Sequence, residues 1–118
     1  MMPLRYLQMD VFADRPGAGN ALGAVIDGER FDPSQMQAFA AWTNLSETIF
    51  LLAPTMPGAD YRVRIFTPRQ ELPFAGHPSV GTAWAAIDTG MVLAGKTRLV
   101  QECAAGLLPV EVEYGMDR

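Results

Sequence analysis

The sequence has one cysteine and one histidine in 118 residues. A single thiol cannot form a disulfide within the chain, which indicates a reducing, cytoplasmic environment. One imidazole and one thiol, His77 and Cys103, are too few for a tetrahedral zinc site within one chain. We therefore expect no bound metal, and we expect Cys103 to be a small apolar residue of low reactivity.

Positive charge and long apolar runs are also scarce. Nine Lys and Arg stand against thirteen Asp and Glu, and the resulting net charge of −4 repels nucleic acid and anionic lipid. No apolar stretch approaches the roughly 20 residues that a membrane-spanning helix needs. The first ten residues lack the pattern of a secretory signal. We therefore expect neither a nucleic-acid partner nor a membrane location.

The length and composition indicate one compact unit. A chain of 118 residues is close to the commonest size of a single domain, and 49% of its residues are apolar, which is enough for a buried core. The sequence contains no repeat, low-complexity tract or compositional break that would mark a linker. We expect residues 1–118 to form a single domain.

Apolar periodicity predicts several strands and two helices. A helix is expected from Asp32, because Asp as N-cap, Pro33 at the first position and Gln35 form a helix start, and it should end near residues 42–44. A second helix is expected over 79–87, where small and apolar residues leave almost no polar face, so it has to be buried on most sides. Strands are predicted at 4–12, 21–26, 48–52, 61–67, 97–102 and 107–113. Together these elements predict an α+β fold in which a mixed β-sheet wraps around a central apolar helix.

The segment 71–78 has the residue types of a ligand-binding loop at a helix start. Gly76 allows backbone to approach a ligand closely, and free N–H groups at a helix start can bind a carboxylate or phosphate. His77, just before the predicted helix, would feel the positive end of the helix dipole, which suits it to polarise a ligand or relay a proton. A purely structural role, in which His77 caps the helix, explains the same position.

Glu47 is a second candidate, at the junction between the first helix and the next strand. It lies between Trp42 and the apolar residues Ile49 and Phe50, and such surroundings suit a carboxyl group that takes up and releases protons. A solvated glutamate at a strand start explains the local sequence as well. Glu71 could join Glu47 in an acid/base pair of the glycosidase type, but the sequence gives no distance between the two carboxyl groups.

Two other patterns carry no chemistry. Gly17-Ala18-Gly19 is followed by Leu22 where a dinucleotide-binding fingerprint has its third glycine, so this segment is interpreted as a turn. Arg62 and Arg64 share one face of a predicted strand, and we expect that face to be solvated.

Several segments of the chain match the pattern of one protein family. The longest, Glu71 to Ala83, contains the run Glu-Leu-Pro-Phe-Ala-Gly-His-Pro and is the most specific. The other segments are Tyr6 to Phe12, Gly19-Asn20, Met36-Gln37, Asn44 to Phe50 and Arg64 to Pro68. With these motifs the chain resembles the N-terminal domain of the phenazine biosynthesis PhzF-like proteins, which are related in fold to diaminopimelate epimerase.

The resemblance implies a cofactor-free isomerase or epimerase site in the cleft between two domains of similar fold. It implies that Glu47 is the catalytic acid/base, moving a proton between carbons of a cyclic hydroxy amino acid, and that His77 is its catalytic partner. The substrate-binding positions that it implies are Asn20, Gly76 and His77, and we expect the backbone from Gly76 to Ser79, including Pro78, to hold a substrate carboxylate.

The match covers only one domain of the family, and three interpretations remain open. The chain has Ala21 where the family usually has Pro, and we expect the second domain, which supplies an Asp and a Ser to the family's site, to be absent. The chain is then half of an isomerase for a small carboxylate, a non-catalytic carboxylate-binding or remnant module, or the product of a truncation. We expect a symmetric homodimer, or a separate second domain, to complete the site.

Overall fold

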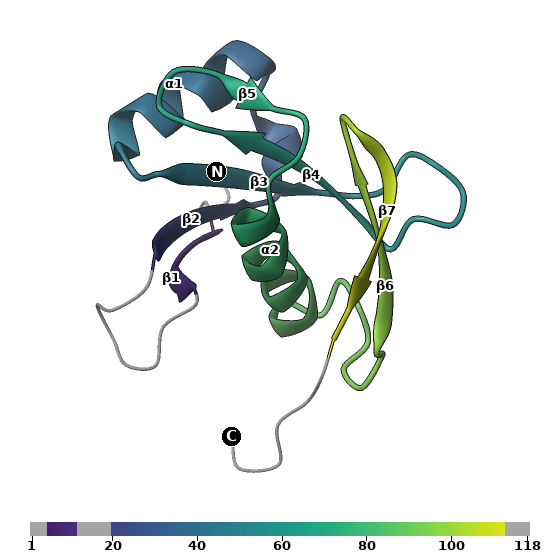
Figure 1. Ribbon diagram of the computed structural model, residues 1–118. Coiled ribbons are helices and arrows are strands. Elements are labelled where there is room, and N and C mark those ends of the chain that lie inside the picture. Colours follow the sequence, from purple (N-terminus) through teal and green to yellow (C-terminus); the bar gives the residue numbers. More distant parts are fainter. Residues whose placement is uncertain (1–4, 12–19, 113–118) are drawn as a thin grey trace.

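The structure is a computed structural model that describes residues 5–11 and 20–112 (Figure 1). These residues form one seven-stranded sheet, two α-helices and a short 3-10 helix. The elements in chain order are β1 (Arg5–Val11), β2 (Asn20–Ile26), η1 (Gly28–Arg30), α1 (Pro33–Thr43), β3 (Glu47–Leu52), β4 (Tyr61–Phe66), β5 (Glu71–Leu72), α2 (Gly76–Asp88), β6 (Arg98–Cys103) and β7 (Gly106–Glu111).

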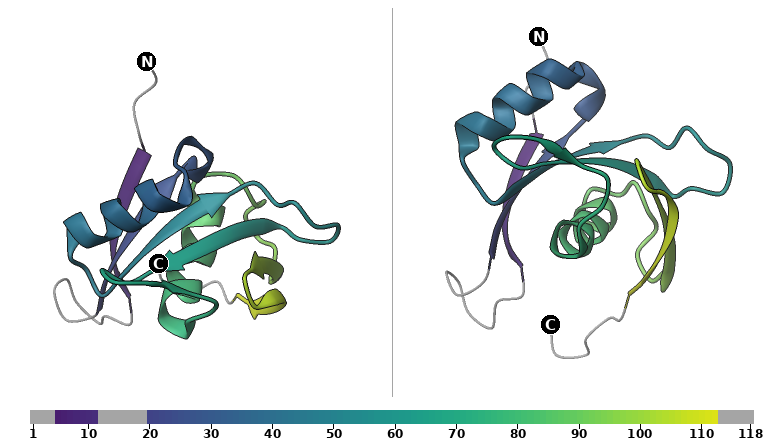
Figure 2. Two further views of the ribbon diagram at one scale, coloured as in Figure 1. Left: turned by 90° about the horizontal axis from the view of Figure 1, so that it is seen from above. Right: turned by 45° about the horizontal axis from the view of Figure 1, so that its top comes forward.

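The sheet is mixed, with strand order β1-β2-β3-β4-β6-β7 and β5 paired to β4. The pairs β2/β3 and β4/β6 are parallel, and the other neighbours are antiparallel. Parallel neighbours need a crossover connection, and α1 and α2 supply the two crossovers. The sheet curls around α2, whereas α1 lies on the outer face (Figure 2). The predicted α+β architecture, a mixed sheet around a central helix, is confirmed.

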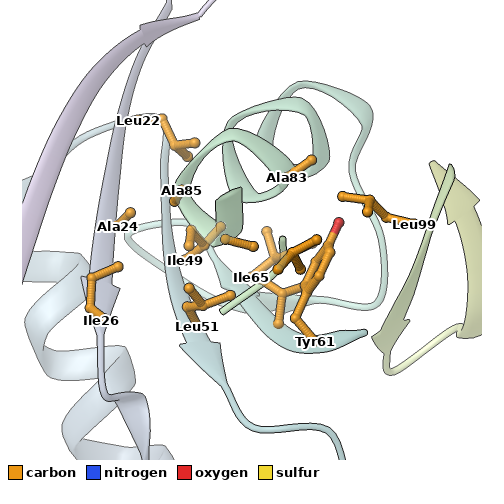
Figure 3. Close-up of a cluster of buried hydrophobic side chains, with 13 residues drawn as sticks. Leu22, Ala24, Ile26, Ile49, Leu51, Tyr61, Ile65, Ala83, Ala85 and Leu99 are labelled. Carbon is orange, nitrogen blue, oxygen red and sulfur yellow. The ribbon is translucent and has the colours of Figure 1, made fainter. Parts of the chain in front are cut away.

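The main core lies between α2 and the inner face of the sheet (Figure 3). Ala83, Ala85 and Ala86 of α2 are buried, and their small side chains allow the helix to approach the strands closely. The strand residues of this cluster include Leu22, Ile49, Leu51, Tyr61, Val63, Ile65 and Leu99. Burial of this apolar surface is the largest favourable term that fixes α2 against the sheet.

A second cluster fills the space between α1 and the outer face of the sheet. It consists of Val25, Met36, Ala40, Phe50, Leu52 and Phe66. The predicted helix start is confirmed: the side chain of Asp32 accepts a hydrogen bond from the N–H of Gln35 at 2.8 Å, and the Gln35 side chain accepts one from the N–H of Asp32 at 2.9 Å. The helix ends at Thr43, within the predicted range, and Asn44 follows in the left-handed conformation with φ 56°.

The central helix is buried on most sides, as expected, but it begins earlier than predicted. It begins at Gly76, so His77 lies inside its first turn instead of just before it. It also keeps one apolar stripe in solvent, because Val80 is 48% exposed and Trp84 is 54% exposed. Within the described ranges, no helix has the length and apolar character needed to cross a bilayer.

Candidate active site

Glu47 is the first residue of β3 and lies on the inner face of the sheet. Side chains alternate along a strand, and Ile49 and Leu51 both belong to the buried cluster around α2. The Glu47 side chain therefore points toward α2, and only 19% of it is exposed. This burial does not fit the interpretation of Glu47 as a solvated residue at a strand start.

His77 faces Glu47 from the first turn of α2. Its Nδ1 atom lies 2.7 Å from Oε1 of Glu47, and 14% of its side chain is exposed. The two side chains are therefore in direct contact. The fold thus brings the two residues that the sequence singled out for proton transfer into direct contact.

The contacting oxygen of Glu47 is enclosed by protein and poorly satisfied. Oε1 is buried, and no donor in the described part of the chain forms a hydrogen bond of regular geometry with it. Its short contact with His77 is an ion pair when the ring carries the proton. A buried polar atom without full hydrogen bonding costs free energy and calls for an explanation other than stability. A carboxyl group held in this state is suited to exchange its proton with a ligand.

The first turn of α2 presents backbone beside this pair. The first N–H groups of a helix have no intrahelical acceptor, but Pro78 has no N–H, and the N–H of Ser79 donates to the Ala75 carbonyl at 3.2 Å. Gly76 and His77 therefore supply the first N–H groups of the helix that point toward its N-terminal end. A Cβ on Gly76 would meet no atom within 4 Å, so the space over this residue is open to a ligand.

The other predicted substrate-binding residues are placed differently. The Pro78 and Ser79 side chains belong to the same turn as Gly76 but are buried. Asn20 is the first residue of β2, and its side chain lies outside the part of the protein that the structure describes. The structure thus joins Glu47, His77 and Gly76 at one place and turns Ser79 inward.

An apolar cavity of about 460 Å³ adjoins the first turn of α2 on the side of the β6/β7 hairpin. Neither Glu47 nor His77 lines it. Its walls are formed by Phe74, Gly76, Ser79, Val80, Ala105, Leu108, Pro109 and Val110. Gly76 thus lines this cavity and directly precedes His77 in the first turn of α2.

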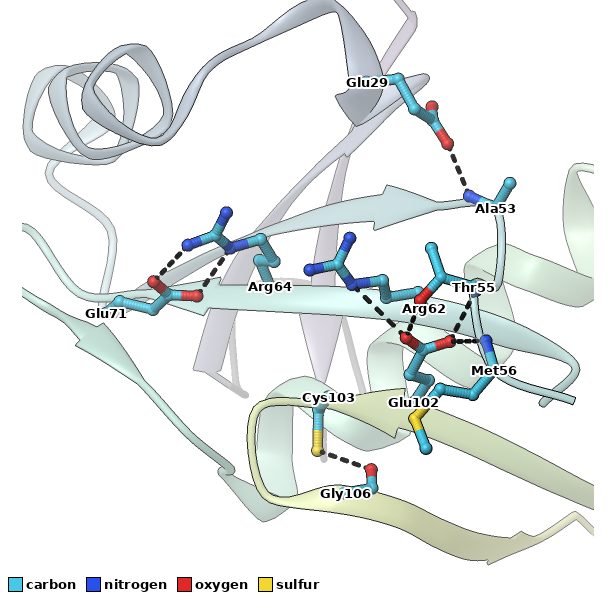
Figure 4. A network of polar contacts seen from close by, with 10 residues as sticks. All are labelled: Glu29, Ala53, Thr55, Met56, Arg62, Arg64, Glu71, Glu102, Cys103 and Gly106. Carbon is cyan, nitrogen blue, oxygen red and sulfur yellow. Dashed lines mark hydrogen bonds and ion pairs between the residues drawn. The ribbon is translucent and has the colours of Figure 1, made fainter.

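The charged residues on the outer face of the sheet are already paired (Figure 4). Arg64 donates two hydrogen bonds to the carboxylate of Glu71, at 2.8 and 2.7 Å, and Nε of Arg62 lies 3.8 Å from Glu102. Both arginine side chains are partly exposed, at 36% and 24%, and each guanidinium group faces an acidic side chain, which the sequence did not predict. Since Glu71 is held by Arg64 on the face opposite α2, a glycosidase-type pair with Glu47 is not formed. No group of three or more His, Cys, Asp or Glu in residues 5–11 and 20–112 is arranged to hold a metal ion.

Gln101 in β6 is the residue that sequence reasoning missed. Its side chain is fully buried, and its Nε2 donates to Oγ of Ser79 at 2.9 Å, so it links the sheet to the first turn of α2. The signal was present in the strand pattern, because Gln101 alternates with outward residues and shares the inward face with Leu99. A polar residue on an apolar strand face is unusual enough to be noted.

The chain matches known proteins over nearly its whole length. Residues 9–118 match the PhzC-PhzF family, described as phenazine biosynthesis-like protein. Antisense-enhancing sequence 1 of Schizosaccharomyces pombe is 42% identical over 112 residues, which are 95% of this chain and 38% of that protein. Trans-2,3-dihydro-3-hydroxyanthranilate isomerase of Pseudomonas aeruginosa is 43% identical over 110 residues, 92% of this chain and 37% of the isomerase.

A solved structure shares the fold. The crystal structure of the Bacillus anthracis phenazine biosynthesis protein of the PhzF family superposes with a TM-score of 0.84 at 32% identity. The superposition covers 98% of this chain and 38% of that protein. The chain thus spans less than two fifths of the length of each of these three relatives.

Proposed function

Because the chain belongs to the phenazine biosynthesis-like PhzC-PhzF family, we propose that it supplies the acid/base part of a site that isomerises a small carboxylic acid. The family and its named relatives support an isomerase-type function. The relative from Pseudomonas aeruginosa is named for trans-2,3-dihydro-3-hydroxyanthranilate. We propose a small cyclic or amino carboxylic acid of this kind as the substrate.

The observation that carries the proposal is the 2.7 Å contact between Glu47 and His77, with its buried and poorly satisfied oxygen. In the proposed reaction the Glu47 carboxylate takes a proton from a substrate carbon, and the electron pair of that C–H bond moves into the conjugated system of the substrate. The same carboxyl group then returns a proton to another carbon. Substrate and product have the same atoms, so the step needs no oxidant, reductant or cofactor.

We propose different roles for the neighbours of Glu47. His77 holds the carboxyl group in place and shares its proton, which keeps the group ready in either protonation state. The backbone at the start of α2 binds the substrate carboxylate, since N–H groups and the positive end of the helix dipole both favour an anion there. Pro78 and Ser79 shape this turn, and Asn20 is a further contact to the substrate.

We propose that a second copy of the chain, or a separate second domain, covers the site. Phe74, Val80 and Trp84 are about half exposed around the first turns of α2, and exposed apolar groups gathered in one area usually mark an interface. This cover would supply the remaining substrate contacts.

We propose that the protein acts in the cytoplasm. Cys103 is a free thiol, and it is the one cysteine of the sequence, so the fold does not depend on an oxidising compartment. A small carboxylic acid from metabolism would be available there.

The Glu47→Gln variant tests the proposed role of the carboxyl group. We expect turnover of trans-2,3-dihydro-3-hydroxyanthranilate to fall by roughly 10²–10⁴-fold, the usual contribution of a positioned acid/base group. The affinity for the same acid should stay within a few-fold of the wild type, because the backbone of α2 and not the Glu47 side chain binds the carboxylate. Turnover is followed by product formation and affinity by titration.

Glu111→Gln is the matched control, since the side chain of Glu111 is 75% exposed at the far edge of β7 and the chemical change is the same. It should leave turnover and affinity unaltered. A wild-type protein that binds the acid without any turnover would contradict the proposal and favour a carboxylate-binding module.

A further inference from the structure

Gln101 is an unusual residue for its position in the core. It lies in β6 directly opposite Tyr61 of β4 in the parallel pairing, and its side chain is 0% exposed, as is that of Leu99 two residues earlier. An amide in such a place costs free energy unless its donor and acceptor groups are both satisfied. A leucine or methionine would fill the same volume without this cost, so the amide calls for a reason other than packing.

Both ends of the Gln101 amide are bonded, and the two bonds connect different layers. Oε1 accepts a hydrogen bond from the Tyr61 hydroxyl at 3.1 Å within the sheet, and Nε2 donates to Oγ of Ser79 in α2 at 2.9 Å. The Tyr61 side chain reaches from β4 toward α2 and Leu99 (Figure 3). Gln101 is thus a polar link between the sheet and the first turn of the helix.

The direction of each hydrogen bond in this link is fixed. The Ser79 hydroxyl donates its one proton to the Ala75 carbonyl at 2.8 Å, so toward Gln101 it can only accept. The amide must therefore present its NH₂ group to Ser79 and its oxygen to Tyr61. Burial raises the pKa of Tyr61 far above its usual range, so the phenol remains a donor. The chain of donors and acceptors has one consistent orientation.

The link ends at the residues that enclose the proposed site. Ala75 is the N-cap of α2, and no side chain caps the helix there. The Ser79 hydroxyl and the Ser79 N–H both bond to the Ala75 carbonyl, and Gly76 and His77 lie between these two residues. The position of this turn sets the 2.7 Å contact between His77 and Glu47.

We propose that Gln101 is a positioning residue, which acts through Ser79 to hold the first turn of α2 so that His77 meets Glu47. The inference rests on the proposed function, because it assigns a purpose to the geometry of that acid/base pair. Apolar packing of the alanines fixes α2 along its length. This packing has no directional preference, so it does not prevent small shifts of the first turn of the helix. The hydrogen bond from Gln101 removes that freedom.

Two variants break the link to the helix and one matched variant spares it. Gln101→Met keeps the volume and removes both bonds, and Ser79→Ala removes the acceptor at the helix. Tyr61→Phe removes the bond on the sheet side, while the Ser79 bond keeps the amide in its orientation. All three lose a buried hydrogen bond, so all three should melt at a lower temperature than the wild type.

The test compares the ¹⁵N and ¹H signals of the His77 ring by NMR with kcat and KM for trans-2,3-dihydro-3-hydroxyanthranilate. In Gln101→Met and Ser79→Ala we expect the ring signals to move toward those of a His77 ring without its carboxylate partner, as defined by Glu47→Gln, and kcat to fall by about 10-fold or more. Tyr61→Phe should keep the ring signals and kcat of the wild type.

Two outcomes would overturn the inference. One is unchanged ring signals in the folded Gln101→Met and Ser79→Ala proteins, and the other is an equal change in Tyr61→Phe. Failure of the proposed function would appear as a wild-type protein without turnover. The ring signals of His77 would still show in that case whether its contact with Glu47 depends on Gln101 and Ser79.

Discussion

Glu102 shows at the scale of one residue how a buried carboxylate is kept charged by its surroundings. Its Oε1 accepts hydrogen bonds from the N–H groups of Thr55 and Met56, at 2.8 and 3.1 Å, and its other oxygen accepts from the Thr55 hydroxyl. Burial alone would raise the pKa of Glu102, but these bonds and the charge of Arg62 outweigh it and lower the pKa below 4.5. Glu47 differs, because its buried Oε1 has no comparable set of hydrogen-bond donors in the part of the chain that the structure describes.

The stability of the protein should depend on pH through Glu102. Because its pKa is lower in the folded state than in the unfolded state, its contribution is complete above pH 4.5 and is lost as the pH falls through the folded pKa. We expect Glu102→Gln to cost roughly 1–3 kcal/mol at pH 7, and the difference from the wild type should shrink in acid. Denaturant unfolding between pH 7 and pH 3 measures this difference.

The exposed Glu111 provides the control for this titration. Glu111→Gln changes the same group at a site that is 75% exposed, so its effect should stay near zero at every pH. A Glu102→Gln effect that is constant from pH 7 to pH 3 would show that the charge of the carboxylate is not what stabilises the loop at Thr55.

The sequence drew attention to Glu47 and His77 but did not predict the contact between them. Glu47 and His77 stood out because a polar residue next to apolar runs and a Gly-His-Pro helix start are local patterns. Their 2.7 Å contact depends on how β3 and α2 pack, and no local pattern encodes such a distance between residues far apart in the chain. The partners of Arg62 and Arg64 were missed for the same reason.

At the scale of elements, the burial of α2 is what the fold depends on most. Ala83 is 4% exposed and packs in the cluster between the helix and the strands. An aspartate there would place an unpaired charge in the core, at a cost of several kcal/mol against a total stability of about 5–15 kcal/mol. We expect Ala83→Asp to abolish soluble folding, as measured by circular dichroism and solubility after expression.

The neighbouring residue offers a matched control for the buried charge. Trp84 is 54% exposed, on the solvent-facing stripe of the helix that it forms with Val80, so Trp84→Asp introduces the same charge in solvent and should fold. A thermal transition of Ala83→Asp like that of the wild type would mean that the inner face of α2 is not buried.

Element starts were predictable where a side chain marks them. The start of α1 carries a capping box at Asp32 and Gln35, and the prediction was accurate there. The start of α2 has Ala75 as an N-cap without a side-chain hydrogen bond, and the prediction placed it three residues late. The short β5 was not predicted, because two residues carry no periodic pattern and the strand depends on pairing with β4.

At the scale of the whole molecule, the apolar stripe on α2 predicts association. Val80 and Trp84 are about half exposed, and the proposed cover of the site needs this surface. We expect a symmetric dimer in light scattering at high concentration, and we expect Trp84→Asp to weaken it at least tenfold while the protein stays folded. A wild-type protein that remains a monomer would rule out self-association and leave a separate domain as the cover.

The most direct test of the central claim is the transfer of deuterium from solvent to the substrate. Trans-2,3-dihydro-3-hydroxyanthranilate is incubated with the protein in D₂O, and the deuterium at its ring carbons is followed by NMR. The account predicts that the wild type places deuterium on carbon and that Glu47→Gln, saturated with the same acid, does not. Deuterium incorporation by Glu47→Gln at the wild-type rate would contradict the assignment of Glu47 as the group that moves the proton.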